Sequence, residues 1–267
     1  HATVHIPEWF TYDEPTPARV ELQERLLAEL RRENAGVAKE RQAIVLAGPP
    51  GAGKSTVKDA LIAGEEGRWR SVDVDDLKAR LIKSARDDGT LESHIKPDAV
   101  KALEVEGEQF SPMELSALAH REAQRLGDLV RQRAMRDGDN LVIDTVLGWE
   151  GQAKRLSSEL TAAGYEVRVV DVECSQEVSA ARIEHRWRTG NERYHANPRG
   201  EELGGRWVPE DYAASLYPSE LGGRSRSEMV AREMAEKCPA VSRYGLHRVS
   251  EPAGSPQLET ALERSVP

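Results

Sequence analysis

One loop sequence sets narrow limits on the fold of this chain: Gly48-Pro49-Pro50-Gly51-Ala52-Gly53-Lys54-Ser55. It matches G-x-x-x-x-G-K-[ST] and follows a short apolar run at 43–47, which suits a buried parallel strand. A helix-compatible stretch at 55–63 comes next. Glycines let successive backbone N–H groups turn around a phosphate, and the following helix points its positive end at the same anion. The pattern predicts a strand, loop and helix that bind a nucleoside triphosphate.

The polar residues at the end of this loop have separate expected roles. Lys54 would reach the β- and γ-phosphates, and the Ser55 hydroxyl would hold Mg²⁺. The candidate contacts to ATP and its magnesium ion are therefore the eight loop residues 48–55 and the next residue, Thr56.

The rest of the chain alternates between strand and helix patterns. Strands are expected at 69–73, 140–145, 166–173 and 246–250, and helices at 18–32, 112–136, 175–188 and 227–237. This alternation predicts an α/β fold: a P-loop kinase-type parallel sheet with helices on both faces and an arginine-rich lid. Residues 1–17 are expected to form an N-terminal arm on the surface, and 18–267 a single kinase domain with an N-terminal helix.

Composition narrows the possible partners. The formal net charge of −9 disfavours a general nucleic-acid binder, which would carry a basic surface. No run of 18 apolar residues exists, so no membrane-spanning helix is expected. Two cysteines cannot form a disulfide framework, and no signal peptide is visible, so a cytoplasmic protein is predicted.

Acidic residues follow two of the expected strands. Alternation along the strand at 69–73 would place Asp73 and Asp75 on one side, where one accepts a proton from a hydroxyl and the other organises Mg²⁺. Asp76 is expected to cap the next helix. Asp144 could touch the Mg²⁺ shell or accept a hydrogen bond from a substrate hydroxyl. No glutamate follows it to activate water, so transfer to an organic hydroxyl fits better than a motor ATPase.

Arginines gather late in the chain. Six lie between 181 and 206, and Arg182 and Arg186 share one helix face because they are four residues apart. Guanidinium groups bind phosphate in a bidentate manner, so such a segment can close over a triphosphate as a lid. The alternative is a solvated helix face paired with neighbouring glutamates.

With these motifs placed, the sequence resembles the zeta toxin family, P-loop kinases of bacterial toxin–antitoxin systems. The resemblance covers about residues 40–245. It implies that Asp75 is the base, that Asp144 orients a sugar substrate and that Asp128 helps to hold it. It also implies that Arg186, or Arg182, and Arg206 are the lid arginines. Family members phosphorylate the 3′-hydroxyl of the amino sugar in UDP-N-acetylglucosamine, and a small helical antitoxin blocks the nucleotide site.

One departure from the family pattern leaves the acceptor open. The family has a glycine, a threonine and an arginine after its strand-end acid, whereas this chain has Thr145, a substrate-binding candidate, and no arginine as far as Trp149. A polynucleotide 5′-hydroxyl kinase or an antibiotic kinase would use the same loop, acid and lid. A nucleotide-dependent regulatory module would bind ATP without an acceptor.

Overall fold

The computed structural model describes residues 2–264 of the chain, and these fall into two compact units. Unit 1 takes its residues from 2–33, 73–130 and 184–207, and unit 2 from 34–72, 131–183 and 208–264. Two helices, α5 (His120–Asp137) and α7 (Gln176–Ala196), contribute residues to both units. The single domain over 18–267 stays a prediction.

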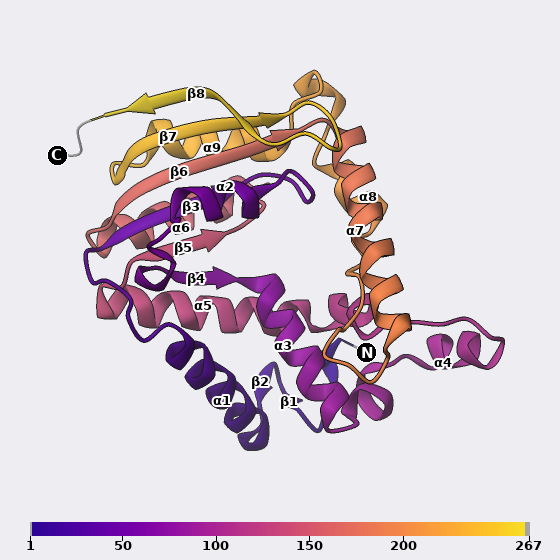
Figure 1. The fold of residues 1–267 in the computed structure, drawn as a ribbon. Helices are drawn as coiled ribbons and strands as arrows, with labels where there is room; N and C mark the ends of the chain where they lie inside the picture. Colours follow the sequence, from indigo (N-terminus) through magenta and orange to yellow (C-terminus); the bar gives the residue numbers. More distant parts are fainter. Residues whose placement is uncertain (1, 265–267) are drawn as a thin grey trace. The chain divides into compact units, whose positions relative to one another are not determined.

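Unit 2 is built on a sheet that has the order β4-β5-β3-β6-β7-β8 (Figure 1). The strands are β3 (Gln42–Ala47), β4 (Arg70–Asp73), β5 (Leu141–Asp144), β6 (Glu166–Cys174), β7 (Val241–Val249) and β8 (Gln257–Glu263). Strand β3 pairs in parallel with both β5 and β6, and β6 pairs in parallel with β7. The last strand, β8, is antiparallel to β7. The predicted, mostly parallel α/β fold is confirmed.

Helices cover both faces of this sheet. Helix α2 (Lys54–Leu61) places Val57 in an apolar cluster with Ile44, Val170 and Val172, which share one face. Helix α9 (Arg226–Lys237) contacts β6 and β7, and α6 (Glu150–Ala162) contacts α9 and β6 (Figure 1). The shorter elements of unit 2 are η2 (Glu66–Arg68), α8 (Glu210–Ser215) and η5 (Ser219–Leu221).

Unit 1 is mainly helical. Besides its parts of α5 and α7 it contains η1 (Thr3–His5), the hairpin β1 (Phe10–Thr11) and β2 (Glu14–Pro15), α1 (Pro17–Glu33), α3 (Val74–Asp87), the π-helical turn η3 (Leu91–Ile95), α4 (Asp98–Val105) and η4 (Pro112–Ala119). Leu81, Ile82 and Leu126 lie in its core and are almost completely buried. The first residues belong to this unit: Val4 and Phe10 are buried, so they pack inside rather than lie on the surface as expected.

The helix expected over 112–136 is two helices of different pitch. Its capping box at Ser111 is present, but residues Pro112–Ala119 form a 3₁₀ helix before α5 begins. Met113, Ser116 and Ala119 are all buried at a spacing of three, which is the period of a 3₁₀ helix. No helix within residues 2–264 is long and apolar enough to cross a membrane.

Candidate active site

The phosphate loop connects β3 to α2 in unit 2. Gly48, Gly51 and Gly53 have φ values of +137°, +80° and +96°, a region that other residues adopt only with strain. A Cβ atom at Gly48 would also overlap the backbone carbonyl oxygen of Val172 on β6. Glycine is therefore required where the loop turns and passes close to the neighbouring strand. The result is a backbone cradle of the kind that surrounds a phosphate group.

Lys54 and Asp144 lie beside each other at this loop. The Lys54 Nζ donates a hydrogen bond to the Gly48 carbonyl oxygen at 2.9 Å and is 3.7 Å from Asp144 Oδ1. Both side chains are largely shielded from water, whereas Ser55 and Thr56 are exposed in the first turn of α2. The charged Lys54 amine can exchange these partners for phosphate oxygens.

The segment after Asp144 is held by the Thr145 hydroxyl. This oxygen accepts hydrogen bonds from the Leu147 backbone N–H at 3.1 Å and from Gln152 Nε2 at 3.0 Å. Leu147 is fully buried at a positive φ of 51°. Trp149, farther along this segment, is 71% exposed. Thr145 thus shapes the loop that follows the strand.

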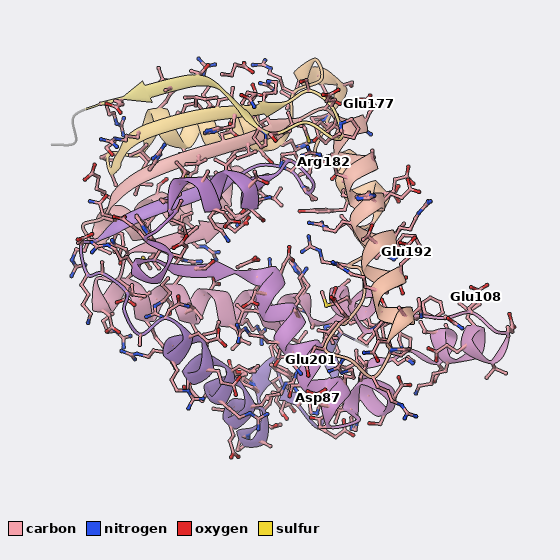
Figure 2. All side chains as sticks on the ribbon, in the orientation of Figure 1. Asp87, Glu108, Glu177, Arg182, Glu192 and Glu201 are labelled. Carbon is pink, nitrogen blue, oxygen red and sulfur yellow. The ribbon has the colours of Figure 1, made fainter. Side chains whose placement is uncertain are left out.

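Arg182 is bound by backbone carbonyl groups of unit 2. It lies on α7 (Figure 2). Its guanidinium donates to the carbonyl oxygens of Gly51 at 3.1 Å, Pro252 at 2.9 Å and Gly254. The side chain therefore connects the phosphate loop to the segment between β7 and β8.

The acids near residue 75 are arranged differently from the prediction. Strand β4 ends at Asp73 and α3 begins at Val74, so strand alternation does not apply to Asp75, which lies in the first turn of the helix. The cap is Asp73, whose Oδ1 accepts the Asp75 backbone N–H at 2.8 Å. Asp76, the expected cap, instead pairs with Arg80 at 2.8 Å. Both expectations were wrong because no loop separates the strand from the helix.

Asp75 forms ion pairs with two cations of unit 1. One carboxylate oxygen lies 2.6 Å from Lys78 Nζ, and the other pairs with the Arg206 guanidinium. Asp75 is about half exposed, while the side chains of Lys78 and Arg206 are 10% and 15% exposed. Burial lowers the pKa of Lys78, the charge of Asp73 opposes this shift, and Arg186 adds to it. The predicted base and a predicted lid arginine are therefore in contact.

Lys78 is the residue that sequence reasoning missed at this site. A helix that begins at residue 74 would have predicted the Asp75–Lys78 pair, because residues three apart lie on the same helix face. The other two predicted residues of this unit are Asp128, half-buried on α5, and Arg186, exposed on α7.

The residues predicted to hold magnesium are in different units. Ser55 belongs to unit 2 and Asp73 to unit 1, where it caps α3. Within residues 2–264, no three or more His, Cys, Asp or Glu side chains lie close enough together to hold a metal ion. A magnesium ion here would therefore need phosphate oxygens to complete its coordination.

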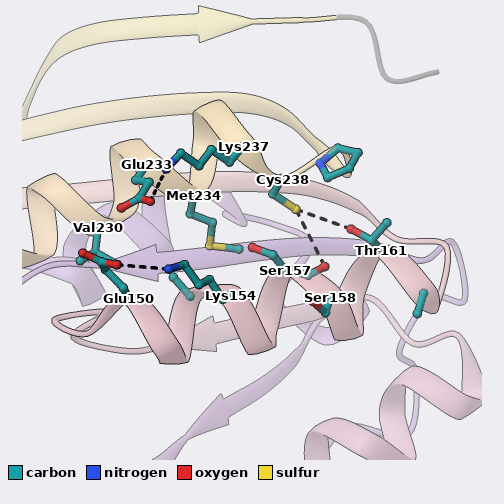
Figure 3. Close-up of a pocket in the computed structure, with 13 residues that line it drawn as sticks. Glu150, Lys154, Ser157, Ser158, Thr161, Val230, Glu233, Met234, Lys237 and Cys238 are labelled. Atoms are coloured by element: carbon teal, nitrogen blue, oxygen red, sulfur yellow. Dashed lines mark hydrogen bonds and ion pairs between the residues drawn. The ribbon is translucent and has the colours of Figure 1, made fainter.

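A pocket of about 470 Å³ lies between α6 and α9 (Figure 3). Val230, Met234 and Cys238 line it, and the ion pairs Glu150–Lys154 and Glu233–Lys237 flank it. It contains none of the predicted site residues. Its lining lacks the phosphate-binding groups of the P loop, so it is a separate feature of unit 2.

The structure resembles solved structures of other proteins. It matches the AvrRxo1-ORF1:-ORF2 complex determined with ATP, with a TM-score of 0.63 and 19% identity over 93% of this chain and 68% of the other. It also matches a structure from the PezAT chromosomal toxin–antitoxin system of Streptococcus pneumoniae, with a TM-score of 0.57 and 18% identity over 88% of this chain and 79% of the other. These similarities show the fold.

The sequence itself identifies the family. No curated protein matches the chain significantly. The model of the zeta toxin family, however, matches residues 28–219, which is more than half of the chain and includes the phosphate loop, Asp75 and Arg206. The protein therefore belongs to the zeta toxin family, whose fold is that of a P-loop kinase.

Proposed function

We propose that this protein is an ATP-dependent kinase that transfers the γ-phosphoryl group to a hydroxyl group of a nucleotide sugar such as UDP-N-acetylglucosamine. The observation that carries the proposal is the contact between Asp75 and Arg206. A carboxylate that can accept a hydroxyl proton and a guanidinium that can neutralise phosphoryl charge are the two groups that such a transfer needs besides the phosphate loop.

The phosphate loop would bind the donor. Its backbone N–H groups and Lys54 would hold the β- and γ-phosphates of ATP. Ser55 would hold Mg²⁺ together with phosphate oxygens, and the ion would neutralise charge on the leaving diphosphate. Arg182, which donates to the Gly51 carbonyl oxygen, would keep the loop in shape.

Asp75 would accept the proton of the acceptor hydroxyl while the hydroxyl oxygen forms a bond to the γ-phosphorus. The bond from that phosphorus to the β–γ bridging oxygen breaks, and ADP leaves. Arg206 and Arg186 would neutralise charge on the transferred group. Asp128, Asp144 and Thr145 would hold the sugar, as the family resemblance implies.

A protein partner is also proposed. The matched structures are a two-component complex and a member of a toxin–antitoxin system. We propose that a small antitoxin protein binds this chain as well and blocks ATP binding. Titrating a candidate partner into the protein and measuring ATP binding would test this, since a partner that leaves the ATP affinity unchanged contradicts it.

The kinase activity can be tested directly. The protein is incubated with ATP, Mg²⁺ and a panel that contains nucleotide sugars, a 5′-hydroxyl oligonucleotide and aminoglycoside antibiotics, and products are identified by mass spectrometry. We expect a phosphorylated nucleotide sugar. Lys54→Ala should abolish the product because it removes the charge that binds the phosphates. If only the oligonucleotide or the antibiotic is phosphorylated, that compound and not a nucleotide sugar is the acceptor. ATP binding without any product would favour a regulatory module.

A further inference from the structure

The backbone that carries Arg206 is held by side chains rather than by secondary structure. Residues 202–209 belong to no helix or strand. Instead, the Oδ1 atom of Asn191 on α7 accepts the Gly205 backbone N–H at 2.7 Å. The same oxygen accepts the hydroxyl of Ser111 at 2.7 Å. Asn191 thus ties the residue before Arg206 to the start of η4.

Close packing leaves this segment little freedom. Gly205 is buried, and a Cβ atom there would overlap the backbone carbonyl oxygen of Trp187. A Cβ atom on Gly190 would lie 2.6 Å from the Gly205 Cα. The two chain segments therefore touch through glycines, one from α7 and one from the segment before Arg206. A side-chain amide within α7 is well placed to fix that contact.

The neighbouring bonds reinforce the arrangement. Trp187 Nε1 donates to Glu114 Oε1 at 3.0 Å, and the other Glu114 oxygen accepts the Ser111 backbone N–H at 2.7 Å. The Met113 N–H donates to the Leu203 carbonyl oxygen at 2.9 Å. All of these groups belong to unit 1, as do Asp75 and Arg206.

We propose that Asn191 is a positioning residue that holds Arg206 against Asp75. A partly exposed ion pair is too weak to order an irregular segment by itself, because ordering the backbone and a long side chain opposes it. The two hydrogen bonds that the Asn191 amide oxygen accepts fix the backbone before Arg206. The Arg206 side chain then needs only to adopt the right rotamer. The catalytic consequence rests on the proposed kinase function, whereas the positioning itself does not.

The first experiment measures the position of Arg206 without using activity. The rate at which phenylglyoxal modifies Arg206 is followed by peptide mass spectrometry. Asn191→Leu keeps the branched shape of the side chain but removes the acceptor. We therefore expect modification to become about tenfold faster, the change that the loss of about one to two hydrogen bonds produces. Asn191→Asp, which keeps an acceptor oxygen, should stay near the parent rate. Glu192→Leu, at the exposed next position of α7 (Figure 2), is the matched control and should also be unchanged.

The second experiment is a double-mutant cycle on the phosphoryl-transfer rate. If Asn191 acts through Arg206, Asn191→Leu lowers kcat in the parent but not in an Arg206→Ala background. Effects that multiply in the double variant, or an unchanged phenylglyoxal rate in Asn191→Leu, would overturn the proposal. If no acceptor is phosphorylated at all, the proposed function fails, and the phenylglyoxal rates still decide the role of Asn191.

Discussion

The carboxylate of Asp75 has a cation on each oxygen, Lys78 on one and Arg206 on the other. These two ion pairs hold the carboxylate in place, and an aspartate carboxylate can take a proton from a hydroxyl. We predict that Asp75→Asn lowers kcat by roughly 10²–10⁴-fold, the range expected for a general base. Affinity for ATP should not change, because Lys54 and the phosphate loop are intact. Steady-state kinetics and calorimetric titration with ATP measure the two quantities.

Two neighbouring acids serve as comparisons for this variant. Asp76 is an exposed partner of Arg80, so Asp76→Asn should be close to the parent in kcat. Asp73 caps α3 by accepting the Asp75 backbone N–H, and an asparagine oxygen accepts this bond equally well, so Asp73→Asn should also be close to the parent in kcat. A larger loss of kcat in Asp73→Asn than in Asp75→Asn, at unaltered ATP affinity, would show that the roles are reversed.

At the scale of one element, β6 carries two acids in an apolar strand. Asp171 and Glu173 are fully buried, and the Tyr244 hydroxyl donates to Asp171 at 2.8 Å. Burial raises the pKa of Asp171 to about 6 and, together with the charge of Asp171, raises the pKa of Glu173 well above its usual value. Glu228 on α9 adds negative charge nearby and is itself paired with Arg248.

These shifts give the stability a defined pH dependence. An acid whose pKa is higher in the folded state binds more protons there, so the free energy of unfolding falls as the pH rises from about 4 through the folded-state values. Glu173→Gln removes the charge and keeps the shape. We predict a shallower fall between pH 5 and 8 and a gain of about 1–3 kcal/mol at pH 8, measured by urea unfolding. Glu177→Gln, at an exposed position, is the control, and an unchanged slope in Glu173→Gln would contradict the prediction.

Local patterns predicted most elements but not all. The apolar run at 43–47 and the strand at 166–173 agree with β3 and β6 to within one residue, because each is a buried run between polar flanks. Strand β8 was missed, since Leu258 and Leu262 are spaced as on a helix face and are more than half exposed. Its structure comes from pairing with β7, and such pairing outweighs local preference.

At the scale of the whole molecule, contacts between distant segments were the hardest to predict. Lys54, Asp75 and Arg206 could be proposed as site residues because each lies in a recognisable pattern, whereas the contacts of Lys78 and Asn191 become visible only when helices and loops are folded together. The division into two units has no sequence signal either. Two of the crossings between them lie inside α5 and α7, where no linker composition marks a boundary.

Those two shared helices lead to a prediction about unfolding. Because α5 and α7 each contribute to both units, unfolding of one unit would unwind helices on which the other depends. We therefore predict a single calorimetric transition, in agreement with one domain over 18–267. ATP with Mg²⁺ binds only the folded chain, and at 100 times its Kd it should raise the free energy of unfolding by about 2.7 kcal/mol. For a chain of this size the midpoint then rises by about 5–10 °C.

The Lys54→Ala variant separates the two parts of this prediction. It should melt as the parent does without nucleotide, because the amine makes only a loop contact and a partly shielded pair with Asp144, and ATP should no longer raise its midpoint. Two transitions in the parent, with ATP moving only one of them, would show that the units unfold separately. A single transition whose midpoint does not change with ATP would instead contradict the assignment of ATP binding to the phosphate loop.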